Sequence, residues 1–289
     1  MTPRAGWHPW AMLGPSLCIL VLFCVVPLVV AGYESLFSWD LLTPARYVGS
    51  ANYRVLIVHG GLLSIVFRTL AFSAIVVVGT MMLGLALAVL LDRPGRIVAL
   101  ARASVFSAYV VSWVAVALLW TWMLDERSGI VARTLRLFGG RPLSPLGDPR
   151  TALPLLAVVA VWKLTGYAMV IFVAGLQSIP RSLHEAAALD GAGAWGRFKH
   201  VTVPQLAPTA AFVATTMLAT SFQAFDVVRV MTQGGPTKAT ELLVYAIYEQ
   251  IFLGLSVGRA SALTVVFFVV LLGFAAGQLR VWRVRAGRR

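Results

Sequence analysis

The sequence predicts an all-α polytopic membrane protein with six transmembrane helices. Its composition and its six separate apolar runs carry that prediction. Of 289 residues, 59% are hydrophobic and 12% are charged, and the mean hydropathy is +0.85. A soluble domain is closer to half apolar and about a quarter charged. One water-facing fold cannot cover so much apolar surface, so the excess is expected to face lipid.

Each apolar run is long enough to cross a bilayer, which takes about 20 residues. The runs are residues 10–33, 69–91, 104–124, 151–178, 206–232 and 260–282. We expect residues 1–289 to form a single transmembrane domain. An even number of spans puts both termini on one side, and the denser basic residues of that side favour the cytoplasm. The net charge of +13 fits anionic lipid headgroups better than nucleic acid, and the tail 280–289 is expected to anchor there.

The segment between the fourth and fifth runs does not look like a plain loop. Pro180 ends the incoming helix, and Ser182 followed by Glu185 is a capping-box pattern for a new short helix. Asp190-Gly191 predicts a bend. A second short helix then carries Trp195 and Phe198 before Pro204 redirects the chain. Residues 180–205 are therefore either a compact docking element or an ordinary interfacial turn.

One motif in this segment resembles a known family. Glu185-Ala186-Ala187, then Gly191, then Val201-x-Val203-Pro204 is similar to the "EAA" signature of binding-protein-dependent ABC importer permeases. The resemblance implies that the loop is cytoplasmic and forms coupling helices in a groove of the ATPase subunit. The residues expected to take part in ATPase coupling are Glu185, Ala186, Ala187, Asp190, Gly191, Trp195 and Phe198.

A second block extends the resemblance over most of residues 65–285. Ser221 to Asp226, Val230 to Pro236 and Trp162 to Pro180 resemble the carbohydrate branch of these permeases, which includes maltose and glycerol-3-phosphate systems. It implies a type I ABC importer permease fold in the bacterial inner membrane. It also implies three kinds of protein partner. These are a homologous second permease, two ATPase subunits that hold ATP and Mg, and an extracytoplasmic substrate-binding protein.

Two helix faces are candidates for the substrate pathway. In the fifth run Met217, Thr220, Ser221 and Ala224 follow the spacing of one helix face. In the fourth run Lys163 and Tyr167 share a face, with Leu164 beside them. Small hydroxylated positions and a Tyr suit a polyhydroxylated ligand, and the resemblance implies that these positions line a sugar site. Helix–helix packing is the alternative, because small polar residues are common at membrane helix interfaces.

Apart from Arg280, where the basic tail begins, the charged residues inside the apolar runs are Lys163, Asp226 and Arg229. Each should face a cavity, a partner or a span end, because a charge at the bilayer centre is costly. Asp226 and Arg229 are three residues apart and are expected to pair. A phosphate contact by Lys163 stays open. Beyond them, Gly234-Gly235-Pro236 predicts a turn that stops the fifth run, and residues 240–255 predict an interfacial helix.

The sequence contains no P-loop, no Ser/His/Asp or Cys/His constellation and no metal-ligand spacing. We therefore expect a non-catalytic permease subunit that binds no cofactor or metal itself. The favoured function is one half of the pathway of an ATP-driven importer of a sugar or sugar derivative. Glycerol-3-phosphate or a glycerophosphodiester is the alternative cargo. A stand-alone secondary transporter is disfavoured, since the spans hold one Asp and no evident repeat.

Overall fold

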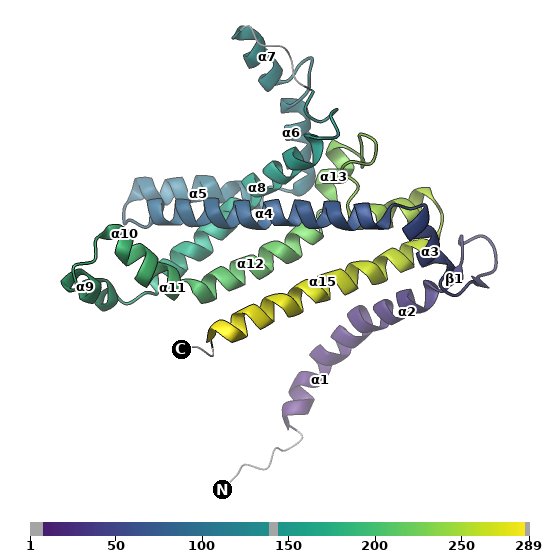
Figure 1. Cartoon of the computed structure of the whole chain (residues 1–289), viewed down its shortest axis with the longest axis horizontal. Coiled ribbons are helices and arrows are strands. Elements are labelled where there is room, and N and C mark those ends of the chain that lie inside the picture. The colour runs from purple at the N-terminus through teal and green to yellow at the C-terminus, as the bar shows by residue number, and fades with distance from the viewer. Residues whose placement is uncertain (1–7, 139–143, 287–289) are drawn as a thin grey trace. The chain divides into compact units, whose positions relative to one another are not determined.

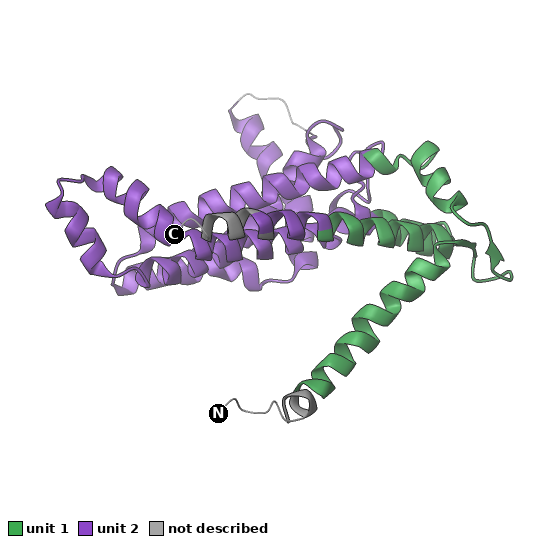
Figure 2. Cartoon of the chain, turned by 60° about the horizontal axis from the view of Figure 1, so that its bottom comes forward, with its two compact units in different colours: residues 1–63, 246–272 green, residues 64–245, 273–289 purple. Residues whose placement is uncertain are grey.

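The structure is a computed structural model that describes residues 8–138 and 144–286. Of the tail predicted to anchor at headgroups, the side chains of residues 281–289 lie outside the described residues. The chain forms two compact units, one of residues 1–63 and 246–272 and the other of residues 64–245 and 273–289 (Figure 2). Apart from a two-stranded hairpin, the regular elements described are helices (Figure 1). The predicted all-α fold class is confirmed.

Four described helices are long and apolar enough to cross a membrane. The first candidate span, Leu13–Glu34, is formed by α1 (His8–Leu20), the π-helical turn η1 (Val21–Val25) and α2 (Val26–Glu34). The others lie in α4 (Leu62–Leu91), α8 (Ala152–Gln177) and α15 (Val257–Ala286). These helices lie at the runs predicted at 10–33, 69–91, 151–178 and 260–282, although α4 begins seven residues earlier than expected and so includes Arg68.

The other two predicted spans are not single straight helices. Residues 104–124 form the end of α5 (Arg96–Val110) and all of α6 (Trp113–Met123), which meet at an angle of 98°. The run 206–232 is also interrupted, because α12 (Ala207–Phe222) ends before α13 (Asp226–Met231) begins. The described residues hold up to six candidate spans if two bent helix pairs each count as one, namely α5 with α6 and residues 194–205 with α12, which meet at 63°. The break between α5 and α6 was not predicted, because residues 108–114 are mostly apolar and contain neither Pro nor Gly to mark the end of a helix.

In the first unit, the segment after α2 is tied to the start of α15. It holds the antiparallel hairpin of β1 (Phe37–Ser38) and β2 (Arg46–Tyr47), followed by α3 (Ala51–Val58). The Asn52 amide donates to the carbonyls of Ser35 at 2.8 Å and Phe37 at 2.9 Å. The Val257 N–H donates to the Trp39 carbonyl at 2.9 Å. None of these elements was predicted from the sequence.

The second unit is organised around α8, much of which is buried (Figure 1). A Cβ on Gly84 of α4 would lie 2.7 Å from the Ala168 Cβ, and one on Gly166 would lie 2.5 Å from the Val105 carbonyl oxygen of α5. A Cβ on Gly175 would lie 2.7 Å from the Thr209 hydroxyl of α12. Glycines thus let three helices approach α8 closely, as small residues do at membrane helix interfaces. The helix α7 (Ile130–Leu137) follows α6.

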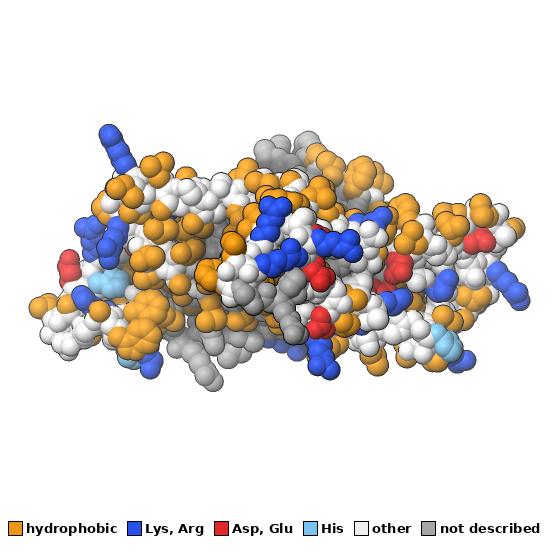
Figure 3. Space-filling view, turned by 90° about the horizontal axis from the view of Figure 1, so that it is seen from above, with side chains coloured by type: hydrophobic (Ala, Val, Ile, Leu, Met, Phe, Trp, Pro, Cys, Tyr) orange, Lys and Arg blue, Asp and Glu red, His pale blue; other side chains and the backbone are white. Residues whose placement is uncertain are grey.

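The turn after α13 confirms the stop predicted at Gly234. Its φ is +80°, and the Tyr245 hydroxyl donates to the Gln233 carbonyl at 2.9 Å. Within this unit the buried Glu241 carboxylate lies 3.6 Å from both Arg68 and Lys238. The helix expected at 240–255 is confirmed as α14 (Leu243–Tyr248) continued by the π-helical turn η3 (Glu249–Leu253). Hydrophobic side chains are spread widely over the face drawn in Figure 3, as a lipid-facing surface requires.

Candidate functional site

The segment between α8 and α12, residues 180–205, folds into a chain of short helices. They are α9 (Arg181–Leu189), α10 (Ala194–Arg197), the π-helical turn η2 (Phe198–Thr202) and α11 (Val203–Gln205). The two short helices predicted here are confirmed. The capping box is wrong, because Pro180 occupies the N-cap position and Ser182 lies inside α9. Pro pre-sets φ near the helical value, so α9 starts directly after it. The chain bends by 63° at Leu206, where α12 follows.

Gly191 makes the bend that joins α9 to α10. Its φ is +80°, a left-handed conformation that favours glycine. The Gly191 N–H donates to the Ala188 carbonyl at 3.0 Å, and the Ala192 N–H donates to the Ala187 carbonyl at 2.9 Å. This pair of bonds is the Schellman motif, which satisfies the last carbonyls of a helix. The predicted bend is confirmed, and it explains why a glycine stands there.

Apolar side chains project from this segment into solvent in the isolated chain. Leu189 is 91% exposed and Trp195 is 74% exposed. The Trp195 ring stacks on Phe198 with 5.6 Å between centroids. Glu185, Ala186 and Asp190 are exposed on α9 and its end. An exposed surface that combines aromatic rings, alanines and two carboxylates suits docking to a partner protein.

One side-chain contact places the end of α8, where the α9–α11 segment begins, beside the turn between α4 and α5. Gln177, at the end of α8, donates from its amide to the Asp92 carboxylate at 3.3 Å. In the same turn Arg102 Nε donates to the Leu91 carbonyl at 2.9 Å. The turn between α4 and α5 and the start of the α9–α11 segment therefore lie at the same end of α8.

On α8, the residues predicted to line the pathway have different surroundings. Lys163 is 2% exposed and its ammonium donates to the carbonyls of Ala108 at 3.2 Å, Tyr109 at 3.0 Å and Val111. Leu164 is buried. Tyr167 is half-buried, and its ring lies 5.0 Å from that of Tyr109, between centroids. Sequence reasoning missed Tyr109, whose only signal was its place in an apolar run.

On α12, Met217 and Ser221 are buried and Thr220 is half-buried. The hydroxyls of Thr220 and Ser221 donate to carbonyls of their own helix at 2.9 and 2.8 Å, so each keeps acceptor capacity. The predicted common face is wrong for Ala224, because α12 ends at Phe222 and Ala224 lies in the break before α13. A pathway role for all seven positions stays a prediction. Asp226 begins α13 and Arg229 lies in its last turn, and their pairing also stays a prediction.

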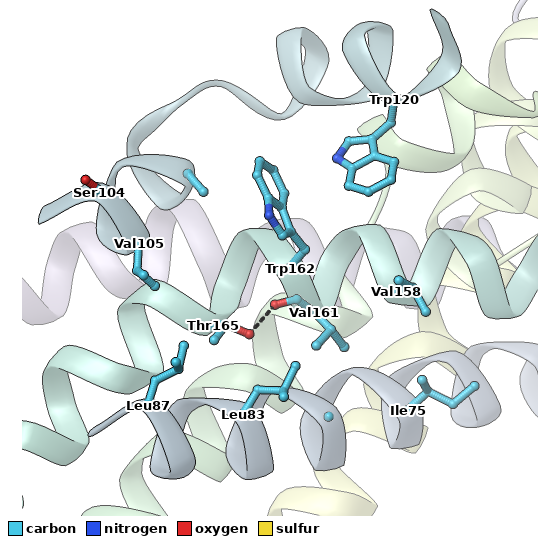
Figure 4. A pocket seen from close by; sticks show the side chains of 12 residues that line it. Ile75, Leu83, Leu87, Ser104, Val105, Trp120, Val158, Val161, Trp162 and Thr165 are labelled. Atoms are coloured by element: carbon cyan, nitrogen blue, oxygen red, sulfur yellow. Dashed lines mark hydrogen bonds between the residues drawn. The ribbon is translucent and has the colours of Figure 1, made fainter. Parts of the chain in front are cut away.

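A cavity of about 730 Å³ lies between α4, α5, α6 and α8 (Figure 4). Its α8 lining comes from Val158, Val161, Trp162 and Thr165. At 100° per residue these positions lie on the face of α8 opposite to Lys163 and Tyr167. The cavity is lined mainly by apolar side chains and is separate from the predicted pathway face. Within residues 8–138 and 144–286, no group of His, Cys, Asp or Glu is placed to hold a metal ion.

The candidate spans and the exposed α9–α11 segment together indicate a class of protein. Several apolar spans, two of them broken, are joined by an exposed helical segment that is shaped for docking. This is the architecture of a multi-pass subunit of a membrane transport system. The model of the family described as "binding-protein-dependent transport system inner membrane component" matches residues 80–285. The chain belongs to that family, and it is a multi-pass inner-membrane permease.

Relatives match over nearly the whole chain. The sn-glycerol-3-phosphate transport system permease protein UgpA of Agrobacterium fabrum is 34% identical, over 94% of this chain and 93% of the relative. The UgpA protein of Pectobacterium atrosepticum is 32% identical, over 96% and 94%. The sulfoquinovosyl glycerol transport system permease protein SmoG of Agrobacterium fabrum is 30% identical, over 95% and 90%.

Solved structures show the same fold. A chain of the bacterial alginate ABC transporter, solved in complex with an alginate pentasaccharide-bound periplasmic protein, gives a TM-score of 0.81 at 21% identity. The match covers 94% of this chain and 92% of that one. A chain of the MetNI methionine ABC transporter gives a TM-score of 0.56 over 77% of this chain. The predicted permease fold is confirmed.

Proposed function

We propose that this chain forms half of the translocation pathway of an ATP-driven importer for a sugar or sugar derivative. A second, homologous permease subunit completes the pathway. Two ATPase subunits hold ATP and Mg, and an extracytoplasmic binding protein delivers the ligand. The chain itself is non-catalytic. The observation that carries the proposal is the exposed α9–α11 segment, where the exposed Glu185, Ala186 and Trp195, the last stacked on Phe198, suit contact with a partner.

The mechanism is alternating access driven through that segment. ATP binding closes the two ATPase subunits, which move the α9–α11 segment together with α8 and α12, because the segment connects those helices directly. The movement opens the pathway outward for delivery, and hydrolysis returns it inward. Packed helices have a few discrete arrangements rather than a continuum, so a small shift at the segment can switch the spans.

We place both termini and the α9–α11 segment in the cytoplasm. The position of the α4–α5 turn at the same end of α8 as the α9–α11 segment supports this, since residues 92–103 hold Arg93, Arg96 and Arg102. Impermeant thiol labelling tests it in a Cys18→Ala/Cys24→Ala background. Glu126→Cys should label in intact cells, and Leu189→Cys only after permeabilisation. The reverse pattern would overturn the orientation.

The alternative cargo is glycerol-3-phosphate or a glycerophosphodiester, and the relatives favour it. Both kinds of named relative are permeases for a glycerol that carries an anionic substituent, phosphate in one and a sulfonated sugar in the other. The ligand specificity of the binding protein that copurifies with this chain distinguishes the two cargoes. Titration with maltose, sn-glycerol 3-phosphate and glycerophosphocholine should give tight binding to one class.

A pull-down of the tagged chain from its native membrane in mild detergent tests the whole assembly. An ATPase, a second permease and a binding protein should copurify. Glu185→Lys should lower the recovered ATPase by about tenfold, because charge reversal at a docking surface is strongly unfavourable. Glu126→Lys is the matched control, a reversal at an exposed carboxylate outside the segment. Recovery of the chain alone, as a stable homo-oligomer, would contradict the proposal.

A further inference from the structure

The bend between α5 and α6 leaves backbone carbonyls at the end of α5 without a helical partner. The helix stops at Val110, and Val111 is extended with ψ of 142°. The last four carbonyls of any helix need partners from elsewhere. In a membrane span this need is acute, because lipid supplies no hydrogen bonds and broken helices survive only where protein or water satisfies the backbone.

Lys163 of α8 supplies the missing donors. A lysine ammonium has three N–H groups, and here three carbonyls accept from Lys163. They belong to Ala108, Tyr109 and Val111. The ammonium also lies 5.0 Å from the centroid of the Trp113 ring and 5.9 Å from that of Tyr109, so both rings add a cation–π contribution. A cation at the C-terminal end of a helix is further favoured by the helix dipole.

Two neighbouring features make this contact specific to the α5 end. One turn along α8, Gly166 lets the α5 backbone approach, because any Cβ there would meet the Val105 carbonyl at 2.5 Å. On the other side of the bend, Ser112 caps α6 by accepting from the Ala115 N–H at 3.2 Å. The start of α6 therefore keeps its own cap when Lys163 is removed, and only the α5 end loses its partners.

We propose that Lys163 is a positioning residue, which holds the α5–α6 bend against α8 and so sets the Tyr109–Tyr167 ring pair on the predicted pathway face. The inference rests on the proposed transport function. An intramembrane lysine can either contact an anionic cargo or hold neighbouring backbone in place, and the contacts of Lys163 favour the second role. All three donors are occupied by carbonyls, so an anionic ligand could bind this ammonium only by displacing one of them. Lys163 thus acts on the pathway through the bend and does not touch the cargo.

The test uses the full transport complex, reconstituted in lipid with its permease partner, ATPases and binding protein. Lys163→Met removes the donors and keeps the chain length. Lys163→Arg keeps the charge and the donors. Thr165→Val is the matched control, since that hydroxyl donates within its own helix, to the Val161 carbonyl at 2.6 Å, on the opposite face of α8. If Lys163→Met does not assemble, Lys163→Gln, which keeps two donors, is measured in its place.

Hydrogen–deuterium exchange gives the first readout, because it needs no cargo. Lys163→Met should speed exchange in the peptide covering residues 107–113 by about tenfold, the scale expected for losing hydrogen bonds to a charged group. Lys163→Arg should restore most of the protection, and Thr165→Val should leave it unchanged. Equal exchange in wild type and Lys163→Met would overturn the proposal.

Uptake of sn-glycerol 3-phosphate and of maltose gives the second readout, per assembled complex. A positioning role predicts that Lys163→Met lowers Vmax by about tenfold for whichever probe is carried, with KM unchanged and Lys163→Arg within about threefold of wild type. A raised KM for sn-glycerol 3-phosphate with Vmax unchanged would make Lys163 a ligand contact and overturn the proposal, as would unchanged uptake. A wild-type complex that carries neither probe counts against the proposed cargo, and the exchange result then decides the role of Lys163 alone.

Discussion

Replacing Gly191 changes the backbone energy of the α9–α11 segment without filling any occupied space. No atom lies within 4 Å of the position of a Cβ at Gly191, so the cost comes from its φ of +80° alone. A left-handed residue other than glycine costs roughly 1–2 kcal/mol, and Asn less because its side chain can bond locally. We expect a few tenths of a kcal/mol for Gly191→Asn, about 1 for Gly191→Ala and about 2 for Gly191→Val, whose branched Cβ is least tolerant of this conformation.

These free-energy costs lower the fraction of molecules in which the Schellman hydrogen bonds at the end of α9 are formed. About 1 kcal/mol shifts the ratio of ordered to disordered segment by about fivefold, and about 2 kcal/mol by about thirtyfold. The rest of the chain should stay folded, because the segment is exposed and makes few contacts with the spans. Coupling should therefore fail before stability does, in the order Asn, Ala, Val.

The assay is ATP-driven uptake per assembled complex, with the amount of assembled complex measured in parallel. Gly193→Ser is the matched control. Gly193 lies two residues away, also has no atom within 4 Å of a Cβ, and has an ordinary φ of −65° at the N-cap of α10. Serine is favoured at that position. The reasoning is refuted if Gly191→Val transports like wild type, or if Gly193→Ser loses as much activity as Gly191→Val.

Three further predictions concern packing, a buried carboxylate and pH. Gly166→Ala should destabilise the chain by about 1–3 kcal/mol in thermal melts, because its Cβ would meet α5 backbone at 2.5 Å, whereas Gly273→Ala, with nothing within 4 Å, should be neutral or slightly stabilising. Arg68→Met should lower the free energy of unfolding by about 1–3 kcal/mol, and Lys238→Met by less than about 0.5 kcal/mol. Both cations lie 3.6 Å from Glu241, but the Arg68 side chain is 21% exposed and that of Lys238 is 66% exposed. Equal losses of stability in the two variants would contradict this. Hydrogen bonds from the Ser128 backbone N–H and hydroxyl hold the pKa of Asp125 below its ordinary value of 3.8. The turn that Asp125 forms should therefore protect the amide N–H groups of Arg127 and Ser128 from hydrogen exchange above about pH 4, and this protection should be lost as the pH falls further. The measurement is amide hydrogen–deuterium exchange against pH, corrected for the intrinsic exchange rate.

Much of the architecture could be predicted, because a helix that crosses lipid needs a continuous run of apolar residues. Twenty apolar residues in a row mean a span, and the ends of α8 were placed within a residue. Gly191 was equally readable, since a glycine after a short helical run commonly marks a left-handed helix end. The capping box failed for a local reason. Pro180 already starts α9, so Ser182 falls inside the helix and its pairing with Glu185 has no place at the N-terminus.

The broken spans could not be predicted, because what permits them lies in other helices. Residues 108–114 read as one apolar run, and the donors that satisfy the end of α5 belong to Lys163, more than 50 positions away. The start of α14 shows the same dependence, since the Leu243 N–H donates to the Thr69 hydroxyl of α4 at 3.0 Å. In both places one polar side chain in an apolar span bonds to the backbone at the end of another helix. A polar residue in such a span can therefore serve the end of a neighbouring helix instead of a bound ligand, and Lys163 is the case in which the two interpretations can be separated by experiment.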